Sequence, residues 1–367
     1  MWLPDSIIQH EFPATNRYTY LNTASCGLTP RAVYQWRSDQ DRRLMEEGSV
    51  FRDQHKPYIV SIRETTSRFV GVDPDRVALV PNFSSGWNVV LEGLPKGSKV
   101  LVLEDEYPSI WWPISERDLE LVMVSGSADP EAALEQAVDQ HRPMAVAMSL
   151  VHYITGIRID PDFIARLKAY HPDMLILADG TQFMGTAPFH FDSSGIDVLG
   201  ASAYKWMMGG YGCGFFALSA LAEQKLRPST LGYNSADRTQ GSRVGIPLAA
   251  RLEPGHQDTL SLGSMEQSLL WTEQHGWEAA FAHLESLREQ AKAAFIDRGW
   301  VAEYAANRPL SSNIFSLRLP EGSFERMQRA GIITSLRGSG VRVSFHLYNT
   351  KADLEKLLQV LDQSSTT

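Results

Sequence analysis

Apolar residues recur in short runs through the first two thirds of the chain. From about residue 76, seven runs rich in Val, Leu and Ile alternate with amphipathic segments. The runs lack a strict alternation of apolar and polar positions, which is typical of strands buried on both faces of a sheet. They are RVALVP (76–81), KVLVLE (99–104), LELVMV (119–124), MAVAMSLV (144–151), MLILAD (174–179), DVLGAS (197–202) and GFFALS (214–219).

Segments with helical spacing lie between several of these strands, among them DPEAALEQAVDQ (129–140) and DPDFIARLKAY (160–170). Strands that alternate with helices predict an α/β fold in which helices cover both faces of the sheet. We expect a large domain over residues 18–260.

The pattern changes after about residue 265. A long helical segment (275–299) ends in glycine and precedes NIFSLRL (313–319), short strands around Ile332 and Val341, and a last helix (351–362). Thr350 and Asp353 suit the N-cap and first turn of that helix. These elements predict a smaller α+β domain of residues 265–367, joined by residues 1–17.

Composition narrows the function. The 34 Lys and Arg against 43 Asp and Glu give a net charge of −9, which argues against nucleic acid or an anionic membrane as the main partner. The start resembles no signal peptide, and no apolar stretch approaches the roughly 20 residues that span a bilayer. The only cysteines are Cys26 and Cys213. A disulfide framework is therefore not expected, and the cytoplasm is the expected compartment.

Polar residues follow several predicted strands, at the sheet edge where α/β proteins bind ligands. After the first strand, NFSSGWN (82–88) places Ser84, Ser85 and Gly86 at a helix N-terminus, where hydroxyls and free N–H groups suit a phosphate. An ordinary N-cap with a glycine turn is the alternative for this motif alone.

Two further strand ends carry an acid and a lysine. Asp179 closes MLILAD, and Gln182 follows three residues later. Lys205 stands among Tyr204, Trp206 and two methionines, where apolar surroundings favour the neutral amine that condenses with carbonyl groups. Each has a structural alternative: Asp179 as a helix cap, and Lys205 as a lysine that reaches solvent from a strand end. No His or Cys stands at metal-ligand spacing nearby, so no metal site is predicted.

Together, a phosphate cradle, an acid and a lysine on successive strand ends are what pyridoxal 5′-phosphate (PLP) requires. The lysine forms the imine, and the acid keeps the pyridine nitrogen protonated. The chain here resembles the aminotransferase class V family of fold-type I PLP-dependent enzymes. The motifs that carry the resemblance are YLNTASCGLTP (20–30), NFSSGWN (82–88), DGTQ (179–182), SAYKW (202–206) followed by GGYGCGF (209–215), and VRVSFHLYNT (341–350).

The resemblance implies a mainly parallel seven-stranded sheet and a role for each matching residue. Lys205 becomes the Schiff-base lysine and the acid/base at Cα, and Asp179 pairs with the pyridine nitrogen. Gln182 bonds the phenolic oxygen of the ring. The phosphate is bound by Ser84, Ser85 and Ser202. Tyr107 stacks on the cofactor ring, or alternatively is only a packed turn residue.

For the substrate, an amino acid, the resemblance implies that Arg342 grips the α-carboxylate, as a bidentate guanidinium does well. Arg337 either helps or lines the entrance, and the segment from Asn22 to Ser25 runs along the carboxylate. His256 lies in EPGHQD (253–258), which resembles a segment that reaches the neighbouring subunit's phosphate in family dimers. A homodimer with shared active sites is therefore expected.

The family's chemistry varies, so fold does not decide the reaction. Desulfurases of the family use a cysteine in the C-terminal part, and this chain has none after Cys213. Transamination is the first expectation, and β-elimination by a carbon–sulfur lyase is the alternative. The aromatic residues Trp87, His152 and Tyr153 suggest a flat side chain on the substrate. A non-enzymatic PLP-binding module is disfavoured because both lysine and acid are present, and no GxGxxG supports a dehydrogenase.

Overall fold

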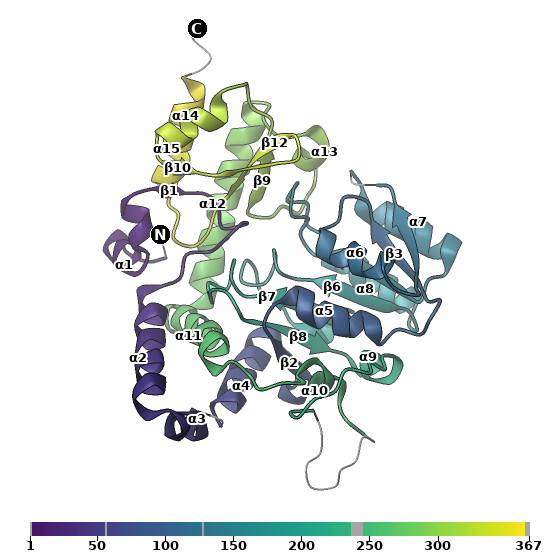
Figure 1. Ribbon diagram of the computed structural model, residues 1–367. Helices are drawn as coiled ribbons and strands as arrows, with labels where there is room; N and C mark the ends of the chain where they lie inside the picture. The colour runs from purple at the N-terminus through teal and green to yellow at the C-terminus, as the bar shows by residue number, and fades with distance from the viewer. Residues whose placement is uncertain (1, 56, 127, 236–244, 364–367) are drawn as a thin grey trace.

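The computed structural model describes residues 2–55, 57–126, 128–235 and 245–363 (Figure 1). The seven predicted strands form one sheet in the order β2-β8-β7-β6-β5-β3-β4. Their bounds are β2 Val77–Val80, β3 Lys99–Leu103, β4 Glu120–Val124, β5 Ala145–Ser149, β6 Leu175–Asp179, β7 Val198–Ser202 and β8 Gly214–Leu218.

The sheet is mainly parallel. Only β8 runs against its neighbours, since it pairs antiparallel with both β2 and β7. The other pairs, from β7 through β6, β5 and β3 to β4, are parallel. The predicted fold class is therefore confirmed, and the carboxyl ends of six strands face one edge, where ligands bind in open α/β sheets.

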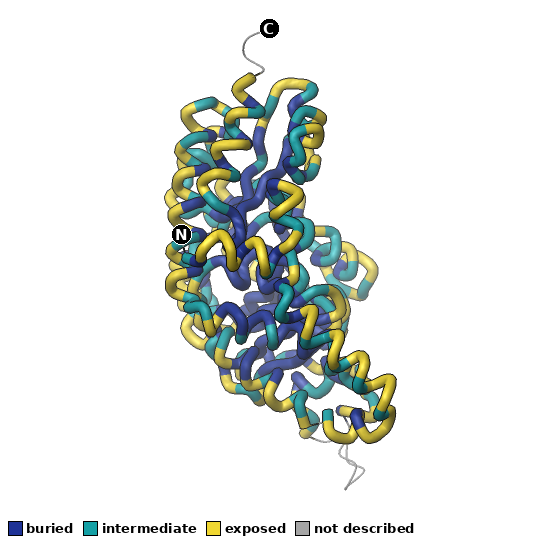
Figure 2. The backbone as a smooth tube through the Cα atoms, turned by 90° about the vertical axis from the view of Figure 1, so that its left-hand side faces the viewer, coloured by how far each residue is buried: buried dark blue, intermediate teal, exposed yellow. Residues whose placement is uncertain are grey.

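Apolar side chains cover both faces of the sheet. In β3, Val100 and Val102 join one buried cluster, while Leu101 and Leu103 join another on the opposite face. Because successive side chains of a strand point to opposite faces, a run without polar positions needs cover on both sides. Figure 2 shows this buried centre as dark blue segments inside exposed turns.

Helices provide the cover. One face packs against α5 (Phe83–Glu92), α6 (Pro108–Ser115), α9 (Ala220–Lys225) and α10 (Leu248–Leu252). The other packs against α4 (Tyr58–Val70), α7 (Pro130–His141), α8 (Pro161–Tyr170) and α11 (Thr259–His275). Outside this layer, α2 (Arg31–Glu47) packs along α11, and α3 (Ser49–His55) follows it.

The C-terminal part has its own core, above the sheet in Figure 1. Its antiparallel sheet has the order β11-β12-β9, and Val343 of β12 pairs with Phe315 of β9. Asp353 accepts the Thr350 N–H at 2.8 Å, which confirms the predicted helix start. The elements are α12 (Trp277–Asp297), α13 (Glu303–Ala306), β9 (Ile314–Leu317), α14 (Ser323–Arg329), β10 (Ile332–Ile333), β11 (Ser335–Arg337), β12 (Gly340–Ser344) and α15 (Lys351–Asp362).

The N-terminal segment joins this part, after α1 (Asp5–Glu11), because β1 (Thr19–Tyr20) pairs parallel with β10. The sequence pattern named neither β1 nor β11, and among the helices it left out α1 to α4, α6, α9, α10, α11, α13 and α14. Gly276, with φ of 96°, separates α11 from α12. Since α11 spans the predicted boundary near residue 265, the limits of the two domains stay a prediction.

Candidate active site

A cavity of about 520 Å³ opens at the carboxyl edge of the large sheet. The loops after β2, β3, β5, β6 and β7 supply its wall. Six of the residues predicted for the site line it together: Ser84, Tyr107, Asp179, Gln182, Ser202 and Lys205. Because these residues come from separate strand ends, their convergence follows from the strand order.

Lys205 follows β7 and is only 7% exposed. Its Nζ lies 5.4 Å from the ring centre of Tyr204 and 5.9 Å from that of Tyr107. Burial lowers the pKa of Lys205 to about 8, with the nearby charges of Arg342 and Arg337 adding to the fall and Asp179 opposing it. About a tenth of this amine is therefore neutral and nucleophilic at pH 7, far more than for a lysine of ordinary pKa.

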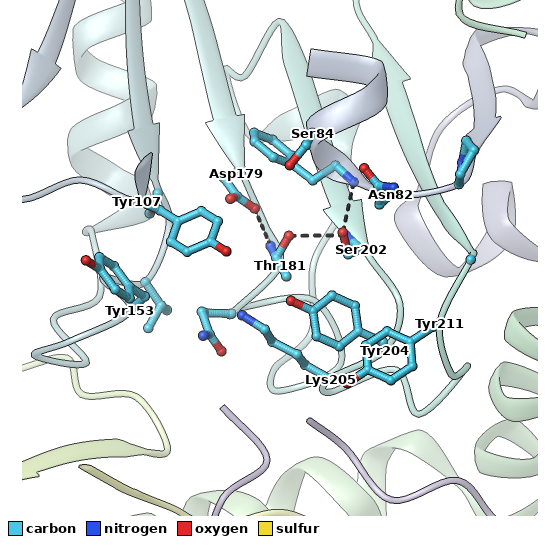
Figure 3. A pocket seen from close by; sticks show the side chains of 16 residues that line it. Asn82, Ser84, Tyr107, Tyr153, Asp179, Thr181, Ser202, Tyr204, Lys205 and Tyr211 are labelled. Carbon is cyan, nitrogen blue, oxygen red and sulfur yellow. Dashed lines mark hydrogen bonds between the residues drawn. The ribbon is translucent and has the colours of Figure 1, made fainter. Parts of the chain in front are cut away.

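Asp179 ends β6 and is as buried as Lys205. The Thr181 N–H donates to its Oδ1 at 2.8 Å, and the Thr181 hydroxyl accepts from the Ser202 N–H at 3.1 Å (Figure 3). Burial raises the pKa of Asp179 to about 6 despite the bonds from Thr181 and the charge of Lys205. A buried carboxylate with a raised pKa is stabilised by any cation that reaches it.

The N-terminus of α5 forms the opposite end of the cavity. Asn82 caps the helix by accepting the Ser85 N–H at 2.9 Å, and the Phe83 N–H donates to the Ser202 hydroxyl at 2.8 Å. Ser84 lines the cavity, and its N–H belongs to the first turn, which has no partner inside the helix. Ser85 is exposed and bonds Asn82 through its hydroxyl as well, so it lies outside the cavity.

Gln182 has a fixed orientation at the cavity wall. Its Oε1 accepts the indole N–H of Trp206 at 2.8 Å, and its Nε2 donates to the Ala24 carbonyl at 2.9 Å. An amide nitrogen has two protons, so one N–H remains for a further acceptor.

Four tyrosines form most of the remaining wall. Tyr107 and Tyr153 meet edge to face at 5.2 Å, and Tyr204 and Tyr211 stack at 5.0 Å (Figure 3). Among the described lining residues, Asp179 and Lys205 are the only ones that carry full charges. Tyr153 therefore lines the cavity, as the predicted aromatic wall requires. The prediction was wrong for Trp87, which is buried and bonds the Ile110 carbonyl, and for His152, which bonds Thr155 and the Asp105 carbonyl.

Arg342 lies behind Tyr153 and does not line the cavity. It is 2% exposed, donates to the Tyr153 carbonyl and to the Ser25 hydroxyl, both at 2.6 Å, and leaves its buried Nε without a partner among the described residues. Burial lowers the pKa of Arg342 to about 10. The N-terminal segment is held close here: a Cβ at Gly27 would meet the Lys205 carbonyl oxygen at 1.9 Å, so glycine is required.

Three other predicted residues lie away from the cavity. Arg337 is exposed on β11, although its charge acts on Lys205. Asn22 pairs with Ser344 through a β-bridge and has a buried Oδ1 without a partner in the described chain. His256 is exposed, stacks on Tyr233 at 5.4 Å and lines a second cavity of about 540 Å³ near α3.

The sequence pattern missed Thr181, Ser149 and Tyr211 as lining residues. Thr181 stands inside DGTQ, so its distance from Asp179 could have singled it out. Ser149 ends β5 and pairs in register with Asp179, which only the strand order reveals. Within the described residues, no cluster of His, Cys, Asp or Glu could hold a metal, and no helix is long and apolar enough to cross a bilayer.

The arrangement fits PLP. At one end the cavity has the Ser84 N–H, in the first turn of α5, and the hydroxyls of Ser84 and Ser202, which bond the Ser109 hydroxyl and the Phe83 N–H. A buried acid lies in the middle, and a lysine of lowered pKa lies beside it. These groups match a phosphate, a pyridinium nitrogen and an aldehyde respectively.

Comparison with known proteins identifies the family to which this chain belongs. The profile of a family described as Aminotransferase class-V matches residues 19–357. Isopenicillin N epimerase from Amycolatopsis lactamdurans is 25% identical, with 95% of each chain covered. A probable cysteine desulfurase from Pasteurella multocida (strain Pm70) is 22% identical, covering 98% of this chain and 92% of its own.

A solved structure repeats the fold at low identity. It is the cystine C–S lyase C-DES in complex with its reaction product cysteine persulfide. The TM-score is 0.83 at 18% identity, over 96% of this chain and 99% of that one. At this identity the likeness establishes the fold alone.

Proposed function

Since the chain belongs to the aminotransferase class-V family, we propose that it deprotonates Cα of an amino acid and then expels the β-substituent of a cysteine conjugate. The family makes the chain an enzyme that depends on PLP, so the predicted class, cofactor and Cα chemistry are confirmed. The roles of individual residues and the last step of the reaction are the proposal.

Lys205 is the residue that binds the cofactor aldehyde and later moves the proton at Cα. Its buried position beside Tyr107 and Tyr204 supports this role because both tasks need a neutral amine. When bound, the cofactor supplies an electron sink for the carbanion at Cα. Asp179 would hold its protonated ring nitrogen, and Gln182 would donate its free N–H to the phenolic oxygen.

The phosphate would lie at the N-terminus of α5. Ser84 and Ser202 offer hydroxyls there, and the helix dipole favours an anion. We assign Ser85 a supporting role, since its hydroxyl bonds Asn82.

Arg342 would bind the substrate carboxylate after it exchanges its bond to the Tyr153 carbonyl for the ligand. Its unpartnered buried Nε supports this assignment because a carboxylate would satisfy it. Asn22 has a buried, unpartnered amide oxygen nearby on the N-terminal segment, and it would orient the substrate amine or a bridging water.

One observation favours elimination: beyond Asp179 and Lys205, the described lining is neutral and rich in phenols. Such a wall suits an uncharged thioether substituent, and the Lys205 ammonium that has taken the Cα proton can pass it to the departing thiolate. The Cα proton passes to Lys205, the Cβ–S bond breaks, and its electron pair leaves with sulfur. Water then releases pyruvate and ammonium. A persulfide route of the desulfurase type is disfavoured because no cysteine follows Cys213.

Transamination, the first expectation from the sequence, is the second candidate. Arg337 favours it: this exposed cation lies close enough to Lys205 and Arg342 to influence both, and it could bind the side-chain carboxylate of an acidic amino acid.

We further propose a cytoplasmic homodimer. Two free thiols, at Cys26 and Cys213, suit a reducing compartment. His256, Tyr233 and the apolar side chains of α2 and α3, including Met45 and Val50, are exposed in the single chain and would contact the second copy. His256 would then approach the phosphate site of that copy.

Product analysis decides between the two reactions. The PLP-loaded enzyme is mixed with cysteine conjugates and, separately, with acidic amino acids. Elimination yields pyruvate, ammonium and thiol over many turnovers without an oxo acid. Transamination converts the cofactor once to its amine form and then stops until an oxo acid is added. The second pattern, without pyruvate, would overturn the lyase assignment. The Arg337→Ala variant should then lose its activity with acidic amino acids.

A further inference from the structure

A closed circuit of contacts surrounds the amide of Gln182 and joins four separate parts of the chain. All its members are nearly inaccessible to solvent. One comes from the loop after β6, one from the turn after β7, two from the segment after β12, and two from the N-terminal segment. We call this set the amide clamp: Gln182, Trp206, His346, Tyr348, Thr23 and Ala24.

Trp206 decides which way the amide points. An indole N–H can only donate, so the atom that it meets at 2.8 Å must be the oxygen of Gln182. The Ala24 carbonyl can only accept, so the atom that it meets at 2.9 Å must be the amide nitrogen. With both ends determined, the second N–H of Gln182 is the group available to a ligand, and the site presents a donor at this position.

His346 holds Trp206 in turn. The imidazole stacks on the indole at 5.3 Å, and its Nε2 donates to the Trp206 carbonyl at 2.9 Å. Its Nδ1 accepts the Leu347 N–H at 2.6 Å, so the ring is neutral with the proton on Nε2. Complete burial lowers the pKa of His346 to about 3, so the ring stays neutral at pH values near 7.

Tyr348 closes the circuit. Its ring stacks on the His346 ring at 4.9 Å, and its hydroxyl bonds the Thr23 hydroxyl. Thr23 precedes Ala24, whose carbonyl receives the Gln182 N–H. Movement of the C-terminal segment is thus transmitted to both bonds that orient the amide.

We propose that Trp206 and His346 are positioning residues, which act through Gln182 to keep an N–H donor directed at the phenolic oxygen of the bound cofactor. This inference rests on the proposed function and names two residues that the reaction does not touch. The donor stabilises the phenolate form of the cofactor bound to Lys205, so loss of the clamp makes that oxygen easier to protonate.

The test is a pH titration of the visible absorption of the PLP-loaded enzyme, with five variants, one of which is His346→Phe. Trp206→Phe keeps an aromatic ring and removes the N–H donor. Gln182→Leu removes the amide, and the double variant carries both changes. Trp87→Phe is the matched control, since Trp87 is equally buried and loses a bond of the same kind, to the Ile110 carbonyl at 3.0 Å.

We expect Trp206→Phe to raise the midpoint of the titration by about one pH unit, the scale of one bond to a charged acceptor. Gln182→Leu should shift it by a similar amount, and the double variant should shift no further, because both changes remove the same interaction. Trp87→Phe should leave the midpoint unchanged. His346→Phe should shift it less, in the same direction, and gives a reading even if Trp206→Phe does not fold.

An unchanged midpoint in Trp206→Phe and His346→Phe overturns the inference. Shifts of Trp206→Phe and Gln182→Leu that add up in the double variant also overturn it, since Trp206 would then act by another path. If the unmodified enzyme binds PLP but has no visible band that depends on Lys205, the proposed function itself fails. The two failures are therefore distinguishable.

Discussion

Asp179 and Asp197 are both buried aspartates of the large sheet, at its opposite edges. Asp197 precedes β7 at the amino edge and accepts from Lys168 Nζ at 2.7 Å, from the Ile176 N–H at 2.9 Å and from the Ser219 hydroxyl at 2.8 Å. Asp179 ends β6 at the carboxyl edge, and within the described part of the chain its hydrogen-bond donors come from Thr181 alone.

The two lysines differ in the same way. Lys168 donates to Asp197 and to the Met174 carbonyl at 2.8 Å. Lys205, in the described chain, has aromatic rings beside its Nζ and no hydrogen-bond acceptor. A buried charge without full pairing costs free energy in the folded protein. The amino edge therefore holds a completed structural pair, and the carboxyl edge holds two groups that, in our proposal, a ligand completes.

The largest effect is expected from Asp197→Asn. It leaves the Lys168 ammonium without its carboxylate, and breaking a buried pair in this way costs about 3–5 kcal/mol of the free energy of unfolding. Urea denaturation of the apo-protein measures the loss. The fraction that folds should still bind PLP. A stable variant with lost PLP binding would reverse the roles assigned to the two edges.

Asp179→Asn should raise the free energy of unfolding of the apo-protein, whereas Asp197→Asn lowers it. Because the folded-state pKa, about 6, exceeds the usual value of 3.8, the acid favours folding at low pH, and this contribution is lost as pH rises through 6. At pH 8 the variant should therefore make the apo-protein more stable, by up to roughly 3 kcal/mol. Turnover should fall at least about 100-fold, since the ring nitrogen loses its counter-ion. Reduced apo-protein stability at pH 8 would contradict this account.

Covalent capture of PLP by the apo-protein should depend on pH through Lys205. Its pKa is lowered to about 8, so the neutral fraction grows with pH and saturates above that value. The initial rate of absorbance change should rise about tenfold per pH unit below 8 and then level off. A rate that still climbs tenfold per unit beyond pH 9 would indicate a lysine with an ordinary pKa.

The smallest effect distinguishes two neighbouring serines. Ser84→Ala should weaken PLP affinity by about fivefold, the value of one hydrogen bond, because Ser84 lines the cavity. Ser85→Ala should change affinity less than about twofold, since its hydroxyl bonds Asn82. Equilibrium dialysis of the two variants gives both values. Equal losses of PLP affinity in the two variants would indicate that Ser85 also binds the phosphate.

The strands, and the meeting of Asp179 and Lys205 in one cavity, could be predicted from the sequence because they depend on local patterns. Apolar runs such as MLILAD identified β6 within a residue, and Asp179 and Lys205 stand at strand ends. Helix α11 was missed because its buried side includes Ser261, Ser264, Glu266 and Ser268 as well as apolar residues, so no helical stripe of apolar residues marks it.

The outer part of the site depends on tertiary contacts. Ser84 and Ser85 are indistinguishable in the sequence, and only the geometry of α5 turns one toward the cavity. Arg342 bonds a carbonyl from position 153, and Trp206 bonds Gln182 across two strands. No spacing rule connects positions so far apart. The limits of the predicted domains stay a prediction because α11 spans the expected boundary. The role of His256 stays one because it depends on contacts with a second copy of the chain.

Reductive trapping tests the central claim most directly. The PLP-loaded enzyme is treated with borohydride, digested and analysed by mass spectrometry, which locates the phosphopyridoxyl group on one lysine. The account predicts modification of Lys205 and an unmodified Lys168, with no label in Lys205→Ala. A label on Lys168 or on another lysine, with Lys205 unmodified, would contradict it.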